Sequence, residues 1–196
     1  MIASLSKLLD PSTPFPIRVT TAQQICNMND HRDVALVIDM RGQAQFKECS
    51  LDKSVNFSLE SFKEDAFINW ATKAKQLEAG NPCFRNKYQL HAFKRRRRHW
   101  VFIIGAHSSH NVNKFVLEMG KFVSKEKQAE LIQQLQTNEE KADFLSLRNA
   151  CLLFKALKKE RLREMDLSIC GFDKIFKFYK HHCLDEHNQH MIPRPT

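Results

Sequence analysis

Hydrophobic residues form two uninterrupted runs along the chain, and both are typical of strands buried on two faces. The first is Val34 to Ile38, which ends at Asp39, and the second is Trp100 to Ile104, which ends at Gly105. Continuous runs of β-branched and large apolar residues, without alternation, are characteristic of central strands in a parallel sheet. A shorter run, Asp166 to Ile169, predicts a third strand of the same kind.

Segments with helical periodicity separate these predicted strands. Apolar residues recur at helical spacing in 111–122, between the second and third strands, and in 173–179, after the third. A short strand at Ile17 to Val19 and a helix capped by Thr20 or Thr21 come before the first buried strand. Strands that alternate with helices imply right-handed crossovers and an open, mostly parallel sheet.

Two long segments do not fit this alternation of strands and helices, and we interpret them as insertions. Residues 59–99 are polar, contain Asn81-Pro82 and end in a basic run, which predicts an inserted loop with one helix near residues 67–77. Residues 124–164 are strongly helical and break at Thr137, where Thr137 and Glu140 have the spacing of a capping box. This second insertion should therefore form two helices in series.

The length of the chain fits one domain with these two insertions. At 196 residues, a second full domain is less favoured than a single buried core. We expect an N-terminal extension at 1–16, one domain at 17–180 and a polar, His-rich tail at 181–196.

The composition of the chain indicates the kind of partner it binds and the compartment in which it works. Thirty-one Lys and Arg against twenty-two Asp and Glu give a formal charge of +9, which favours acidic partners. The six Cys include no C-x-x-C pair, which favours a reducing compartment. No stretch approaches the roughly 18 apolar residues of a membrane span. The expected location is the cytoplasm, including a cytoskeletal or membrane-associated assembly there, while the nucleus and the mitochondrion stay open.

The segment from Val34 to Ser58 resembles the opening of rhodanese-like domains. In that family a buried strand ends in D-x-R, a helical turn carries E-F, and a loop of the form G-H-I-P-G-A-I-N-I-P follows. Here the loop keeps the apolar and Asn positions, but its glycines, its histidine and both prolines are replaced. Cys170-Gly171-Phe172 similarly resembles the family's G-G-F turn before its last helix. The positions that carry the motif are Asp39, Arg41, Phe46, Asn56, Gly171 and Phe172.

The resemblance implies an α/β fold, with a rhodanese-like open parallel sheet flanked by helices. It also implies that Asp39 and Arg41 form hydrogen bonds that fix the loop after the first buried strand. In an active rhodanese a Cys follows the central strand, and a loop of backbone N–H groups leading into a helix stabilises its thiolate or persulfide. The corresponding loop here consists of Gly105, Ala106, His107, Ser108, Ser109 and His110.

This loop contains no Cys, and Gly105 stands where the nucleophile is expected. We therefore expect a pseudoenzyme with no catalytic residue and no cofactor, similar to the degenerate rhodanese-like domains of some TBC-domain proteins of membrane traffic. The expected function is a protein-interaction or scaffold module that belongs to a larger complex.

Three alternatives for this loop stay open. His107 or His110 could act as a base on Ser108 or Ser109, although the sequence assigns no carboxylate partner and contains no G-x-S-x-G elbow. The loop could bind an anion through its N–H groups, because that property depends on backbone geometry. A divergent sulfurtransferase or phosphatase could instead take its nucleophile from an insertion.

The basic run before the second buried strand is the main candidate for partner binding. We favour an acidic protein as its partner, while nucleic acid, anionic lipid, a nuclear-localisation signal or a merely solvated loop are the alternatives. The helical insertion adds apolar surface that could also dock a partner. The run consists of Lys94, Arg95, Arg96, Arg97 and Arg98.

His181, His182 and Cys183, with His187 and His190, bring possible metal ligands together near the C-terminus. Their spacing does not match a closed zinc pattern. We therefore expect a polar tail here and no bound metal.

Overall fold

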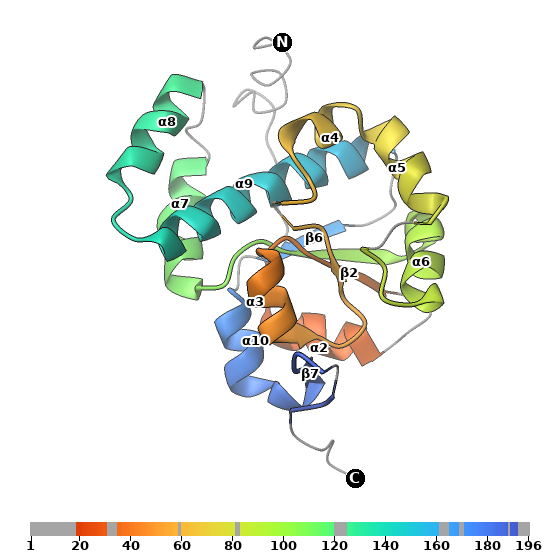
Figure 1. The fold of residues 1–196 in the computed structure, drawn as a ribbon. Coiled ribbons are helices and arrows are strands. Elements are labelled where there is room, and N and C mark those ends of the chain that lie inside the picture. Colours follow the sequence, from red (N-terminus) through yellow and green to blue (C-terminus); the bar gives the residue numbers. More distant parts are fainter. Residues whose placement is uncertain are drawn as a thin grey trace.

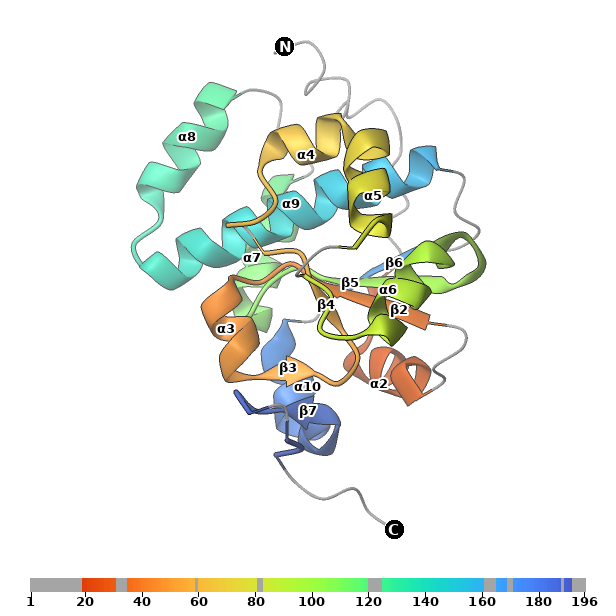
Figure 2. The same cartoon turned by 45° about the vertical axis from the view of Figure 1, so that its right-hand side comes forward.

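The computed structural model describes residues 19–30, 35–58, 60–80, 83–119, 125–160, 165–168, 171–187 and 189–191. Within these residues, five parallel strands form one open sheet in the order β1-β6-β5-β2-β4 (Figures 1 and 2). The bounds of these strands are β1 Val19–Thr20, β2 Ala35–Asp39, β4 Val55–Asn56, β5 Trp100–Ile104 and β6 Met165–Ser168. The prediction of an α/β fold with an open parallel sheet is therefore confirmed.

The two longest apolar runs form the centre of the sheet. Strand β5 has the predicted bounds, and it pairs with β2 along all five residues of each strand. Strand β6 begins one residue earlier than expected and pairs with the other side of β5. Val34, Ile169 and Cys170, together with Ile17 and Arg18 of the first predicted strand, lie outside the described residues.

Helices cover both faces of the sheet. On one face, α2 (Ala22–Asp30) and α10 (Phe172–Phe178) pack against Val37, Phe102 and Ile104. The opposite face buries Leu36, Ile38, Val101 and Ile103 beneath a larger group of helices. Figure 2 shows the sheet between these two helical layers. Helix α2 begins where the sequence predicted, because Thr21 Oγ1 accepts a hydrogen bond from the Gln24 N–H at 3.2 Å.

Residues 59–99 are not a polar loop with one helix. Their described part contains α4 (Glu64–Ile68), α5 (Trp70–Glu78), α6 (Lys87–Lys94) and the 3-10 turn η1 (Arg96–Arg98). Each of these helices carries few apolar residues, which gave only a weak periodic signal. The apolar residues of these helices, with Phe62 just before α4, are nevertheless buried in the largest core cluster: Phe62, Phe67, Trp70, Ala74, Leu77 and Phe93. The segment is therefore part of the core.

The second insertion forms the predicted pair of helices, α8 (Lys125–Gln134) and α9 (Asn138–Lys159). The capping box is confirmed, since the Glu140 N–H donates to Thr137 Oγ1 at 3.0 Å and the Thr137 N–H donates to Glu140 Oε2 at 3.2 Å. Helix α7 (Ser109–Met119) begins two residues earlier than expected, and residues 120–124 lie outside the described part. Helix α9 runs across the sheet (Figure 1), and its apolar side joins the same core as α5 and α6.

The C-terminal segment is not simply a polar tail. After the 3-10 turn η2 (Lys180–His182), β7 (Cys183–Leu184) pairs antiparallel with β3 (Ser50–Leu51), which follows α3 (Gln43–Glu48). Cys183 and Leu184 are buried, and this apolar pair explains why the chain folds back here. Residues 188 and 192–196 lie outside the described part. Among the described helices, none is long and apolar enough to cross a membrane.

Candidate functional site

A fully buried ion pair fixes the loop that follows β2. The Arg41 guanidinium donates to both Asp39 carboxylate oxygens, with its Nε at 3.1 Å from each and its Nη2 at 2.8 Å from Oδ2. The same Nη2 donates to the Cys49 carbonyl at 2.8 Å, and the guanidinium lies 3.5 Å from the centre of the Phe172 ring. Because a buried charge is tolerated only when paired and hydrogen-bonded, this arrangement is structural, as the family motif implied.

The other motif residues pack around this pair. Asn56 Nδ2 donates to the carbonyls of Asp39 at 3.0 Å and Arg41 at 2.9 Å, which joins β4 to the same loop. Phe46 is buried on α3, beneath the guanidinium of Arg85 at 4.3 Å. These residues thus hold one end of the sheet together.

Gly171 is required by a close approach between two loops. A Cβ built at this position would lie 2.2 Å from the backbone nitrogen of Ser109, so only glycine fits without backbone movement. The next residue, Phe172, donates its N–H to the Ala106 carbonyl at 3.0 Å, and Asp173 donates to the His107 carbonyl at 2.9 Å. The turn before α10 is therefore bonded directly to the loop after β5.

The loop after β5, residues 105–110, forms a cradle of N–H groups at the start of α7, and a carboxylate of the same chain occupies it. Asp143 of α9 accepts from the N–H of His107 at 2.7 Å and from the N–H of Ser108 at 3.0 Å. It also accepts from Asn111 Nδ2 at 2.9 Å, and only 1% of Asp143 is exposed. Converging N–H groups at a helix N-terminus attract negative charge. The anion that this loop binds is thus an internal one.

Helix α9 also covers the position expected for the nucleophile. Gly105 is buried, and a Cβ built on it would lie 2.7 Å from Leu147 Cδ1 and 3.4 Å from Ala150 Cβ. Leu147 is itself 1% exposed, so its side chain has little room to move. A cysteine at this position would therefore contact the packed side of α9 instead of facing solvent.

The serine and histidine residues of the loop have other bonding partners. Ser109 donates its N–H to Asp173 Oδ1 at 3.1 Å, and its hydroxyl is bonded to the same oxygen. His107 Nδ1 lies 3.4 Å from Arg41 Nη1, and its ring packs on Phe172. Because guanidinium only donates, Nδ1 must be the acceptor in this contact. Among the described residues, neither His107 nor His110 hydrogen-bonds Ser108 or Ser109, so the geometry for a histidine-activated serine is lacking there.

The cysteines of the insertions are poorly suited to act as nucleophiles. Burial raises the pKa of Cys83 to about 11 and the pKa of Cys151 to about 12. Both thiols are therefore protonated at neutral pH, whereas the reactive form of a cysteine is the thiolate. The sequence could not distinguish these thiols from reactive ones, because their burial depends on contacts between segments that are far apart in the sequence.

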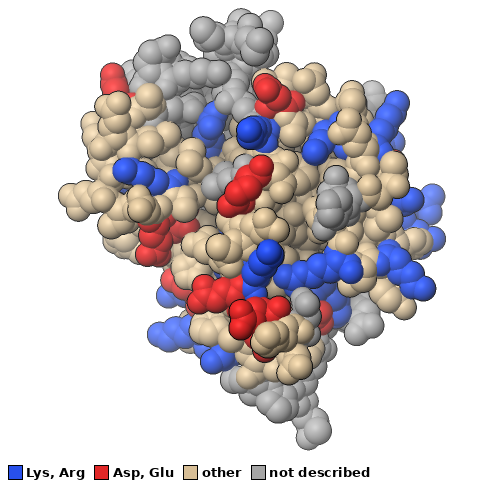
Figure 3. Space-filling model, in the orientation of Figure 1, with Lys and Arg blue, Asp and Glu red and all other residues tan. Residues whose placement is uncertain are grey.

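The basic run does not act as one unit. Lys94, Arg95, Arg97 and Arg98 are exposed, whereas Arg96 is 4% exposed. Arg96 pairs with Glu78 of α5 at 2.6 Å and with Glu160 at 2.8 Å, just after α9. It therefore belongs to the interior and not to the expected patch. Figure 3 shows Lys and Arg side chains gathered on the side of the molecule that carries α5 and α6.

Within the described residues, no three His, Cys, Asp or Glu side chains lie together as metal ligands. Comparisons with protein-family models, curated proteins and solved structures found no match to this chain. The fold and the site define an α/β protein whose central loop cradle is filled by its own carboxylate.

Proposed function

We propose that this chain is a catalytically inactive rhodanese-like module that binds a protein partner within a larger cytoplasmic assembly. The observation that carries the proposal is the position of Asp143. Its carboxylate occupies the N–H groups of His107 and Ser108, where an active rhodanese would stabilise a thiolate or a persulfide. An external anion would have to displace this buried group.

The surroundings of the cradle support the same proposal. Gly105 offers no nucleophile, and Leu147 packs against the space that a side chain there would need. The pKa values of about 11 for Cys83 and about 12 for Cys151 argue against a thiolate supplied by an insertion. The alternative of a divergent sulfurtransferase or phosphatase therefore gains no support from these residues.

Partner binding is proposed for the exposed cations Lys94, Arg95, Arg97 and Arg98, which we call the basic surface. Trp100 follows Arg98 after one buried residue, His99, and is 36% exposed. Arginine and aromatic side chains are enriched at protein interfaces, and the positive charge favours an acidic partner. Within residues 83–100 the exposed aromatic side chains are Tyr88 and Trp100. Two such side chains are fewer than the series of stacking platforms that single-stranded nucleic acid generally uses, which favours a protein partner.

Turnover and partner capture test the two halves of the proposal. The purified chain should form no thiocyanate from thiosulfate and cyanide above the rate without protein. Thiocyanate formation that is lost in Cys83→Ser or Cys151→Ser would contradict the proposal that the chain is catalytically inactive.

Partner capture requires a matched pair of charge reversals. In affinity capture, Arg97→Glu with Arg98→Glu should release the main bound protein. Lys174→Glu with Lys177→Glu makes the same change in charge on exposed positions of α10 and should retain it. If both pairs of substitutions retain or both release the bound protein, the basic surface is not its specific binding site.

A further inference from the structure

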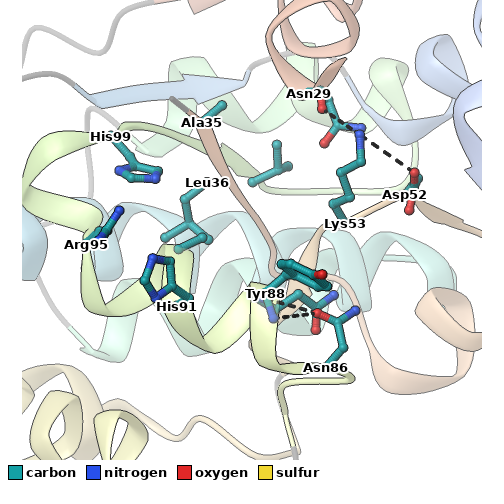
Figure 4. Close-up of a pocket in the computed structure, with 13 residues that line it drawn as sticks. Asn29, Ala35, Leu36, Asp52, Lys53, Asn86, Tyr88, His91, Arg95 and His99 are labelled. Carbon is teal, nitrogen blue, oxygen red and sulfur yellow. Dashed lines mark hydrogen bonds and ion pairs between the residues drawn. The ribbon is translucent and has the colours of Figure 1, made fainter. Parts of the chain in front are cut away.

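A slot opens beside the edge of β2, on the side that faces α6. Its volume is about 330 Å³, and its lining includes Ala35, Leu36 and Val37 of β2 together with Tyr88 and Arg95. Figure 4 shows β2 running between α6 and Asn29. The labelled side chains of His91 and Arg95 lie on the α6 side of the strand, and those of Asn29 and Lys53 lie on the other side. We call this space the β2 slot.

The slot exists because β4 is shorter than β2. Strand β4 pairs only with Ile38 and Asp39, so residues 35–37 of β2 extend past its described end. The Met40 N–H donates to the carbonyl of Ile104 in β5, whereas the Asp39 carbonyl accepts from Phe57 on the opposite side. In a parallel ladder the bonding direction alternates with each residue. The N–H and C=O of Ala35 and the N–H of Val37 therefore point toward the slot.

Residues of two helices line the slot, one helix on each side of β2. Helix α6 supplies Tyr88 and His91 on one side, where Arg95 follows directly after the helix, and α2 supplies Asn29 on the other side. At one end, Lys53 Nζ donates to the Asn29 carbonyl at 3.1 Å. The slot therefore lies between two helices and has the aliphatic residues Ala35, Leu36 and Val37 of β2 in its lining.

The slot carries a net positive charge. Arg95 and Lys53 line it, and its single carboxylate, Asp52, lies 3.9 Å from Lys53 Nζ, so the charge of Arg95 is the one left over; His91 and His99 add imidazole rings to the lining. Arg95 and His91 are exposed, and in the part of the chain that the structure describes Arg95 forms no ion pair. A ligand with carboxylates at the rim would supply the opposite charge.

We propose that the β2 slot binds an extended acidic segment of the partner protein, which adds to the sheet beside residues 35–37 of β2. This inference rests on the proposed function and identifies the kind of segment that the basic surface would attract. The segment hydrogen-bonds Ala35 and Val37 through its backbone and places carboxylates beside Arg95 and His91. Addition of a strand to an exposed sheet edge is a general mode of peptide recognition, in which the main chain supplies affinity.

The architecture favours a peptide over a nucleic acid. Directional backbone groups along a strand match another backbone, and an aliphatic lining suits apolar side chains on one face of that strand. Tyr88 is 74% exposed and can pack on the added segment from the α6 side. Phosphate binding would use the cations but would leave the edge groups of β2 unpaired.

The test uses a fluorescein-labelled peptide, Glu-Val-Glu-Val-Glu-Val-Glu, and fluorescence anisotropy with the full chain. A second peptide of the same sequence is N-methylated at alternate amides, which removes backbone donors without changing charge. N-methylation should weaken binding by about tenfold or more. Arg95→Glu should also weaken it by about tenfold, whereas the matched Lys174→Glu should change it less than about twofold.

Testing the pairing on the peptide avoids a proline in β2, which could prevent folding. No binding up to about 1 mM peptide, or equal binding of both peptides, overturns the proposal. Displacement by single-stranded RNA with no effect of N-methylation overturns it in favour of phosphate recognition. If the peptide fails while partner capture still depends on Arg97 and Arg98, the β2 slot is excluded and the proposed function stands. If the peptide does not bind and partner capture does not depend on Arg97 and Arg98, both the β2 slot and the proposed function are excluded.

Discussion

Replacing Asp143 by alanine should destabilise the fold more than any single surface change. The substitution removes the acceptor for the His107 and Ser108 N–H groups and for Asn111 Nδ2, at 2.7, 3.0 and 2.9 Å. Asp143 is 1% exposed, so its hydrogen bonds are shielded from water in the wild type. Unsatisfied buried donors cost about 1–3 kcal/mol each. Part of that loss is offset because the carboxylate no longer has to be desolvated.

We therefore expect Asp143→Ala to lower the free energy of unfolding by about 3–5 kcal/mol, a large part of the total stability of a typical domain. Asp143→Asn should cost less than alanine, because its amide oxygen can still accept one of the three hydrogen bonds. Urea denaturation followed by circular dichroism measures the difference without adding salt. Glu139→Ala, an exposed change in the first turn of the same helix, is the matched control.

Added anion provides a second measurement of the same cradle. Sulfate or phosphate should raise the stability of Asp143→Ala more than that of the wild type, because only the variant presents unpaired N–H groups to an anion. A cost below about 1 kcal/mol, with no specific effect of the anion, would refute the assignment of Asp143 as the ligand of the cradle.

Three further predictions concern other parts of the fold. Gly171→Ala should cost about 2–4 kcal/mol in urea denaturation, since its Cβ would lie 2.2 Å from a backbone nitrogen; a cost near zero would show that the two loops separate easily. Arg96→Ala should cost about 2–4 kcal/mol, because it removes the buried cation that pairs with Glu78 and Glu160, while Glu160 keeps its hydrogen bond from Trp70. Arg97→Ala should stay within about 0.5 kcal/mol, and equal costs would contradict the division of the basic run. The hydrogen bond from Lys114 lowers the pKa of Glu140 below its ordinary 4.5, so the stability that Glu140 contributes is complete above about pH 4.5 and is lost as the pH falls through the lowered pKa. In a carboxylate NMR titration, Lys114→Met should move the pKa of Glu140 upward, and no movement would exclude this cause.

The sheet and its motif residues could be predicted because their signals are local. Strand β5 was bounded correctly by an uninterrupted apolar run, and the capping box before α9 followed from the spacing of Thr137 and Glu140. The contact between Arg41 and Asp39 spans two residues. Each of these signals requires only neighbours in the sequence.

The contents of the cradle could not be predicted in the same way. Asp143 lies 36 residues after His107 in a helical stretch, where an acidic residue near a helix start normally faces solvent. Its role depends on how α9 crosses the end of β5. Arg96 was likewise indistinguishable from its basic neighbours, because its partners come from α5 and from the end of α9. The helices in 59–99 were missed for a related reason, since each contributes only a few buried apolar residues.

The most direct measurement of the central claim is a titration of the wild-type chain with thiosulfate, followed through the backbone amide resonances of His107 and Ser108. The claim is that Asp143 already occupies these N–H groups. Their resonances should therefore stay in place in the wild type and should shift saturably in Asp143→Ala. A saturable shift of both resonances in the wild type would show that the cradle accepts an external anion and would contradict the account.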